Sequence, residues 1–130
     1  MFAVTKAEQE KIDYYLALVQ IVIEAATEWG FQLPQLCNLL GMEPREFRSI
    51  DKLKEHLSAS INRDVQERCE VVERIKSILE AIFTGDLDGQ KEWLLASESK
   101  FRGRSPYDLM KGGGFWDLHA VQLLLQEVSD

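Results

Sequence analysis

The segment Asn62–Gly85, NRDVQERCEVVERIKSILEAIFTG, has the most regular apolar pattern of the chain. Its apolar residues recur at steps of three and four, the spacing of one face of an α-helix. These residues are Val65, Cys69, Val72, Ile75, Leu79, Ile82 and Phe83. Asn62 can cap the start of the helix, and Gly85 suits its end. We therefore predict one long helix over about 63–84, with this face in the core.

A second long helix is predicted over residues 6–29, ahead of this segment, with Gly30 as its stop. The part from Tyr14 to Ile23 is apolar on nearly all sides, which is more than one small core requires. Two explanations stay open for this excess. One is a subunit interface, which predicts a homodimer, and the other is a central core helix.

Between the two long helices, residues 31–52 have the pattern of a helix-turn-helix. Pro34 and Pro44 each suit the first turn of a short helix, and Gly41 suits the left-handed residue that ends the first one. Cys37 supplies a small side chain where the helices cross. The apolar anchors of the second helix are Phe47 and Ile50. This spacing is typical of Xre/Cro-like repressors.

The second of these helices predicts a DNA-binding surface. Its outward side chains are Arg45, Arg48, Ser49 and Lys52. Arginine suits phosphates and guanine edges, and residues 31–63 carry five basic against four acidic side chains, so this is the one segment that is not acidic. Glu43 and Glu46 oppose DNA binding, so a scaffold that does not bind DNA stays the alternative.

Helical signals continue to the end of the chain. A short amphipathic helix is predicted within residues 51–61, and Asp86 caps a helix that runs through Trp93–Leu95. Ser105-Pro106-Tyr107-Asp108 combines a cap, a first-turn proline and the acid of a capping box. The glycines at 112–114 end that helix, and a last helix follows from Phe115 to Val128. No strand-like alternation appears, so we predict an all-α fold with seven or eight helices.

Composition narrows the classes of function. The chain has 130 residues and a net charge of −7, from 15 basic and 22 acidic side chains, so strong non-specific binding of nucleic acid is not expected. The sequence has no apolar run long enough to span a membrane and no basic start followed by an apolar block. Cys37 and Cys69 stand far apart and form no CxxC, so we expect two thiols in the reducing cytosol.

The C-terminal third resembles the Xre/MbcA/ParS toxin-binding domain. The resemblance lies in Trp93-Leu94 and in Phe101-Arg102-Gly103-Arg104-Ser105-Pro106-Tyr107-Asp108-Leu109-Met110, and it covers about residues 75–128. It implies a division into a helical region at 1–62, with the helix-turn-helix at about 31–52, and a small helical toxin-binding domain at 63–130. It also implies a homodimeric antitoxin whose partner is a RES- or ParT-like toxin that attacks or uses NAD. Many members of this family also repress their own operon through the helix-turn-helix, so operator DNA is a second expected partner.

Charge and position select the residues expected to contact a toxin. These are Arg102, Arg104 and Lys111, together with the tail Glu127, Val128, Ser129 and Asp130. The residues of the resemblance itself have complete roles as core, turn or cap, and we interpret them mainly as architecture. Phe115 and Trp116 have two interpretations that stay open, either as core side chains or as an exposed anchor for a partner.

Catalysis finds little support in the sequence. His56 and His119 show no pairing with a Ser or Cys nucleophile. The segment Asp86-Leu87-Asp88-Gly89 begins like a calcium loop but lacks its later ligands. The glycines at 112–114 do not have the sequence of a phosphate-binding loop. We expect no enzyme activity and no cofactor. The remaining alternative to an antitoxin is a helical transcription regulator or an interaction domain that has no toxin partner.

Overall fold

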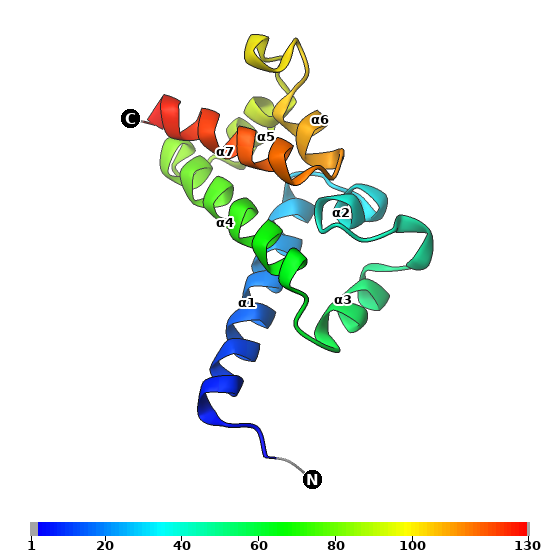
Figure 1. Cartoon of the computed structure of the whole chain (residues 1–130). Coiled ribbons are helices and arrows are strands. Elements are labelled where there is room, and N and C mark those ends of the chain that lie inside the picture. The colour runs from blue at the N-terminus through cyan, green and yellow to red at the C-terminus, as the bar shows by residue number, and fades with distance from the viewer. Residues whose placement is uncertain (1–2, 130) are drawn as a thin grey trace.

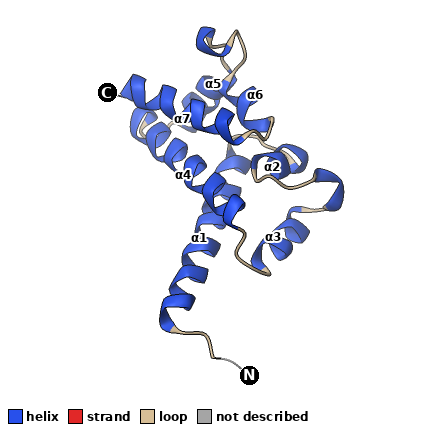
Figure 2. Cartoon of the chain, viewed as in Figure 1, coloured by secondary structure: helices blue, strands red, loops and turns tan. Residues whose placement is uncertain are grey.

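The computed structural model describes residues 3–129, and in this part of the chain every regular element is helical (Figure 2). The elements are, in chain order, α1 (Lys6–Glu28), α2 (Leu33–Leu39), the 3-10 turn η1 (Pro44–Glu46), α3 (Ile50–Ser58), α4 (Arg63–Phe83), α5 (Leu87–Leu95), the 3-10 turn η2 (Ser99–Phe101), α6 (Pro106–Lys111) and α7 (Phe115–Ser129). The predicted all-α fold is confirmed, with seven α-helices over the described residues.

Side chains cap the helices where the sequence predicts caps. The side-chain oxygens of Asn62 and Asp86 each accept a hydrogen bond from the amide three residues later, at 3.1 and 3.0 Å. Ser105 and Asp108 form the predicted reciprocal pair. Ser105 Oγ accepts from the Asp108 amide at 3.0 Å, and Asp108 Oδ2 accepts from the Ser105 amide at 3.1 Å. Each bond pairs an amide that the first helical turn would leave unsatisfied.

Helix α4 lies at the centre, with α1 packed along one side and α7 along another (Figure 1). The predicted apolar face of α4 is fully buried from Val65 to Leu79. The last turn differs from the prediction, because Ile82 is exposed and Phe83 is only half-buried beside Gly89 of α5. One hydrophobic core joins side chains from before and after residue 62, and the division into regions 1–62 and 63–130 stays a prediction.

Helix α1 is buried along its C-terminal half, and its N-terminal half projects from the body (Figure 1). Most of the stretch from Tyr14 to Ile23 faces the chain's own core. Two of its large side chains do not, because Tyr14 is 50% and Ile21 is 39% exposed. The core-helix explanation therefore accounts for most of the apolar excess. The homodimer stays a prediction, with these two side chains as its remaining support on α1.

The prediction of one continuous second helix in the helix-turn-helix is wrong, because the structure divides this segment into η1 and α3. Helix α2 forms, but η1 is a single turn, and the backbone of Phe47 is extended at φ −123° and ψ 128°. The cause is the cap of the next helix. Ser49 Oγ accepts from the Lys52 amide at 3.2 Å, and a cap residue needs extended rather than helical angles. The chain therefore leaves the helical conformation at 47–49 and starts α3 afresh at Ile50.

Arg68 of α4 ties three segments together. Its Nη1 donates to the Gly113 carbonyl at 2.6 Å, its Nε pairs with Asp64 at 3.0 Å, and its side chain is 12% exposed. Two glycines permit this packing. A Cβ on Gly41 would lie 2.8 Å from Arg68 and Asp64, and one on Gly113 would lie 2.8 Å from the Asn38 carbonyl. The end of α2, the start of α4 and the α6–α7 connection are thereby held in one place.

Candidate functional site

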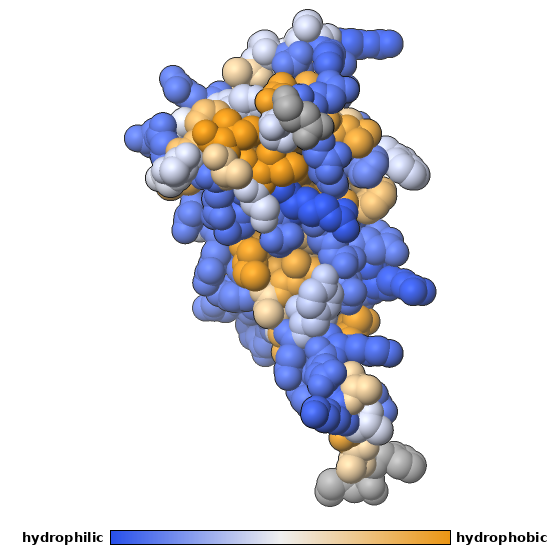
Figure 3. All heavy atoms as spheres, turned by 90° about the vertical axis from the view of Figure 1, so that its left-hand side faces the viewer, coloured by the Kyte–Doolittle hydropathy of each residue, from blue (hydrophilic) through white to orange (hydrophobic). Residues whose placement is uncertain are grey.

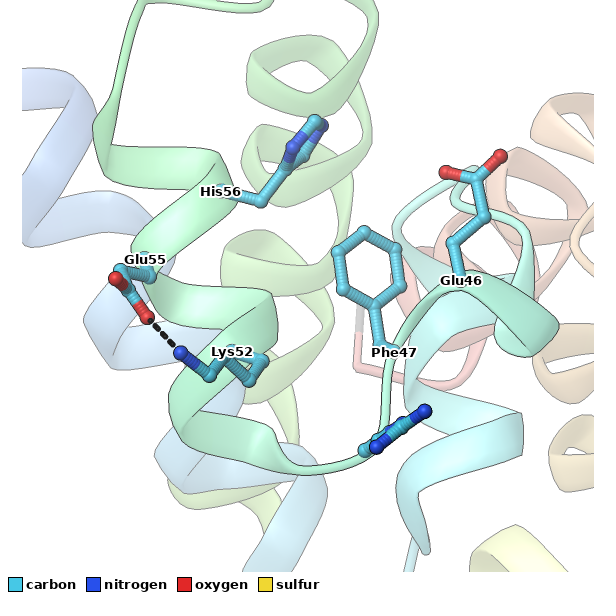
Figure 4. A pocket seen from close by; sticks show the side chains of 6 residues that line it. Glu46, Phe47, Lys52, Glu55 and His56 are labelled. Atoms are coloured by element: carbon cyan, nitrogen blue, oxygen red, sulfur yellow. Dashed lines mark ion pairs between the residues drawn. The ribbon is translucent and has the colours of Figure 1, made fainter.

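Two of the predicted DNA-binding residues, Arg48 and Lys52, line an open groove of about 560 Å³ between η1 and α3 (Figure 4). Its lining residues are Glu46, Phe47, Arg48, Lys52, Glu55 and His56. The Phe47 ring points into the space between Glu46 and His56, and it meets the His56 ring edge-to-face with the ring centroids 5.3 Å apart. Lys52 pairs with Glu55 of the same helix at 3.2 Å. The groove therefore mixes acidic, basic and aromatic side chains.

The four predicted DNA-binding residues do not share one helix. Arg45 lies on η1, Arg48 in the extended linker, Ser49 at the cap of α3, and Lys52 on the first turn of α3. The three basic side chains are exposed, whereas Ser49 is half-buried and uses its hydroxyl as the cap. Only Arg48 and Lys52 line the groove. The single DNA-reading helix of the sequence prediction is thus replaced by basic groups on three local structures.

Residues 96–105, called the projecting loop below, stand out from the helical body (Figure 1). Phe101 anchors the loop in the core, and the Glu98 amide donates to the Arg104 carbonyl at 3.1 Å. Lys100 Nζ pairs with Glu127 Oε2 of α7 at 2.5 Å. The hydrogen bond to Glu127 raises the pKa of Lys100, because it favours the charged ammonium. The loop is therefore closed by its own backbone hydrogen bond, packed through Phe101 and tied to the end of α7.

The structure brings most of the predicted toxin-contacting residues to this end of the molecule. Arg102 and Arg104 are exposed on the projecting loop, and Glu127, Val128 and Ser129 are exposed at the end of α7. Arg102 adopts the left-handed conformation, with φ +58°. The remaining tail residue, Asp130, lies outside the described residues.

Lys111 is separated from that group. It ends α6, beside the start of α7, while Glu127 lies near the far end of α7, a helix of 15 residues or about 22 Å. Its ammonium pairs with Asp108 at 3.3 Å and lies 5.2 Å from the centre of the Tyr107 ring. Hydrogen bonds from Ser105, together with Lys111, hold the pKa of Asp108 below its usual value. Lys111 therefore supports the capped turn of α6.

Trp116 is an exposed aromatic residue, and the sequence left its orientation open. Its side chain is 76% exposed, whereas Phe115 is half-buried against the core. Adjacent helical positions point about 100° apart, and Phe115 takes the inward direction at the start of α7. Trp116 meets the rings of Phe115 and His119 edge-to-face, with centroid distances of 5.5 and 6.1 Å. Phe115 therefore packs against the core, whereas a partner contact by the exposed Trp116 stays a prediction.

Further apolar side chains reach the surface. The largest exposed ones are Val4, Tyr14, Ile21, Ile61, Ile82, Leu95, Trp116, Leu123 and Val128. Figure 3 shows apolar atoms in two areas of one face, with hydrophilic side chains between them. This face therefore exposes two separate apolar areas.

The thiols of both cysteines lie in the hydrophobic core. Burial raises the pKa of Cys69 to about 12, which disfavours the nucleophilic thiolate, and Cys37 is also buried. The described residues contain no group of three or more His, Cys, Asp or Glu side chains that could hold a metal ion. None of the described helices is long and apolar enough to cross a membrane.

Comparison with known proteins adds no assignment, because no protein-family model and no curated protein matches this sequence.

Proposed function

We propose that this protein is an antitoxin-like protein that binds and neutralises a cognate toxin acting on NAD, a RES- or ParT-like protein. The observation that carries the proposal is the capped turn at Ser105–Asp108 together with the projecting loop before it. The reciprocal hydrogen bonds of 3.0 and 3.1 Å fix the direction of α6 within the motif on which the resemblance rests.

The position of charged groups supports a protein partner at the loop end. Arg102 and Arg104 stand exposed on a loop that Phe101 packs against the core and the Lys100–Glu127 pair ties to α7, so the backbone of the loop loses less entropy on binding than that of a free loop. The net charge of −7 suits a basic toxin, because complementary charge accelerates association. Together these groups offer a preorganised surface.

Co-expression with the product of an adjacent reading frame tests the proposal. We expect the intact chain to restore growth and to co-purify with the toxin. The double variant Arg102→Glu and Arg104→Glu should lose the complex while keeping its helical circular dichroism. The matched control is Lys6→Glu with Lys11→Glu, two exposed charges on the projecting end of α1. An intact chain that binds no such product would refute the antitoxin and favour a regulator or an interaction domain without a toxin.

The tail gives a second test, which also removes the Lys100–Glu127 tie of the projecting loop. Val128 and Ser129 are exposed, and Glu127 makes only the surface ion pair with Lys100. Removal of residues 127–130 should therefore change the free energy of unfolding by less than about 1 kcal/mol and still release the toxin. A truncated chain that protects cells fully would show that the tail has no part in neutralisation.

Operator binding forms the second part of the proposal, supported by the exposed side chains of Arg45, Arg48 and Lys52. Because no long recognition helix carries them, we expect phosphate contacts to dominate, with affinity that falls steeply as salt rises. The change Arg45→Ala with Arg48→Ala should abolish a gel shift on the upstream DNA and leave the melting temperature nearly unchanged. Undiminished binding would place the DNA contact elsewhere.

A homodimer completes the proposal, supported by the exposed Tyr14 and Ile21 of α1. Light scattering at tens of micromolar should report twice the mass of the chain. The double change Tyr14→Glu and Ile21→Glu should yield a monomer with unchanged helix content. A monomeric intact chain would refute the homodimer.

A further inference from the structure

Two adjoining cavities lie where the N-terminal half of α1 meets the α3–α4 linker and the start of α4. Ile61 of the linker lines both of them, so they meet at its side chain. The basic cavity, of about 330 Å³, is also lined by Lys11, Tyr14, Arg63 and Gln66. The apolar cavity, of about 280 Å³, is also lined by Ile12, Tyr15, Leu16 and the linker residues 58–60. Each is at the small end of the range for ligand pockets, so a ligand held there would be small.

The charges of the basic cavity favour an anion. Lys11 comes from α1 and Arg63 from the first turn of α4, and neither forms an ion pair with any residue of 3–129. Among the described residues, no acid lines this cavity. Glu70 contacts one of its lining residues, because its carboxylate accepts from the Tyr14 hydroxyl at 2.9 Å, and Asp64 is already paired within α4. Two cations from separate helices are therefore left without a partner.

Tyr15 supplies an independent requirement in the apolar cavity. Its side chain is only 1% exposed, and its hydroxyl forms no hydrogen bond with any described residue. Burial raises the pKa of this phenol, and the backbone of Asn62 opposes the rise only in part, so the hydroxyl keeps its proton. A buried donor without an acceptor is unfavourable. Because Ile12 and Leu16 line the same cavity, it suits an apolar chain that carries one oxygen acceptor.

We propose that the two cavities together bind a small carboxylate whose alkyl chain carries a carbonyl oxygen, the chemistry of a medium-chain oxo acid. The carboxylate lies between Lys11 and Arg63, and the chain passes Ile61 and Leu16. The carbonyl oxygen accepts from the Tyr15 hydroxyl. Because Tyr15 is almost fully buried, the chain has to enter the apolar cavity to form this bond. The site is independent of toxin and DNA binding, and its test needs neither partner.

The test follows isoleucine methyl signals by NMR during titration with 6-oxoheptanoate. Ile61 lines both cavities and should show a saturable shift, while Ile82, exposed at the other end of α4, is the internal control. Heptanoate lacks the carbonyl oxygen and 2-heptanone lacks the carboxylate. Each should bind about fivefold more weakly, the loss expected for one hydrogen bond or one exposed ion pair. No saturable shift of Ile61, an equal shift of Ile82, or equal affinity for the three compounds would overturn the site.

Two variants assign the two ends of the ligand. Arg63→Gln should weaken binding of 6-oxoheptanoate by about fivefold, whereas Arg102→Gln removes the same charge from the projecting loop and should leave binding unchanged. Tyr15→Phe removes only the hydroxyl, so 6-oxoheptanoate and heptanoate should then bind equally, and the melting temperature of the free protein should not fall. Unchanged binding by Arg63→Gln, or a preference for the oxo acid that survives Tyr15→Phe, would overturn the assignment. A lower melting temperature of Tyr15→Phe would do the same, because the hydroxyl would then have a partner within the protein.

Discussion

Replacing Arg68 by methionine should destabilise the protein by about 2–3 kcal/mol. Methionine keeps most of the aliphatic stem but removes the guanidinium that bonds Gly113 and Asp64. The bond to the Gly113 carbonyl is charge-assisted and partly buried, so its loss costs about 1.5–3 kcal/mol. The pair with Asp64 adds about 0.2–0.5 kcal/mol, because the Asp64 side chain is 58% exposed.

Urea unfolding followed by circular dichroism measures this loss. With a slope of roughly 1–3 kcal/mol/M, the midpoint should fall by roughly 1 M or more. Arg74→Met is the matched control, an exposed arginine of the same helix that forms no ion pair with a described residue, and it should change stability by less than about 0.5 kcal/mol. Asp64→Asn should lower the free energy of unfolding by only the about 0.2–0.5 kcal/mol of the Arg68–Asp64 pair. Equal midpoints for the Arg68 and Arg74 variants would refute the reasoning that Arg68 holds the three segments together.

Three further predictions concern stability. Ser105→Ala should cost about 1 kcal/mol in urea unfolding, because one amide of α6 loses its cap; no loss would mean that the capping box contributes nothing. Leu79→Ala should cost about 2–5 kcal/mol, because the side chain is fully buried on α4, and a smaller loss would indicate that the core collapses around it. The pKa of Cys69 rises on folding from 9.0 to about 12, so its contribution is complete below pH 9 and is lost as the pH rises toward 12. The free energy of unfolding under reducing conditions should therefore fall across that range, by up to about 1.4 kcal/mol per pH unit, and should fall less steeply in Cys69→Ala.

Features that depend on residues close in sequence could be predicted. Asn62, Asp86 and Ser105 cap helices through bonds that span three residues, so the sequence contains the whole interaction. The extended linker at 47–49 was missed, although Ser49 ahead of Ile50 is an ordinary cap signal. The apolar spacing around Gly41 favoured one continuous second helix in the helix-turn-helix, and the cap signal of Ser49 was given less weight.

Features that depend on tertiary contacts could not be predicted. The Lys100–Glu127 pair joins residues 27 positions apart, and nothing local to either residue indicates it. The exposure of Trp116 follows from which side of α7 meets α4, which the nearly uniform apolar pattern of that helix leaves undecided. The pocket lined by Gln90 also depends on tertiary structure, because the ends of α1 and α4 and the start of α5 meet there.

The side-by-side packing of α1 and α4 has a consequence for how fast the chain folds. The Tyr14–Glu70 bond spans 56 residues and the Arg68–Gly113 bond spans 45, so the bonds that join α1 to α4 and α4 to the α6–α7 connection link residues distant in sequence. Closing a loop of this length costs about 3.5 kcal/mol of entropy before those contacts form. We therefore expect folding slower than that of a bundle whose neighbouring helices follow one another directly. Halving the connection formed by α2, η1 and α3 would recover only about 0.6 kcal/mol of that closure entropy, so chain connectivity limits the rate far more than the final stability.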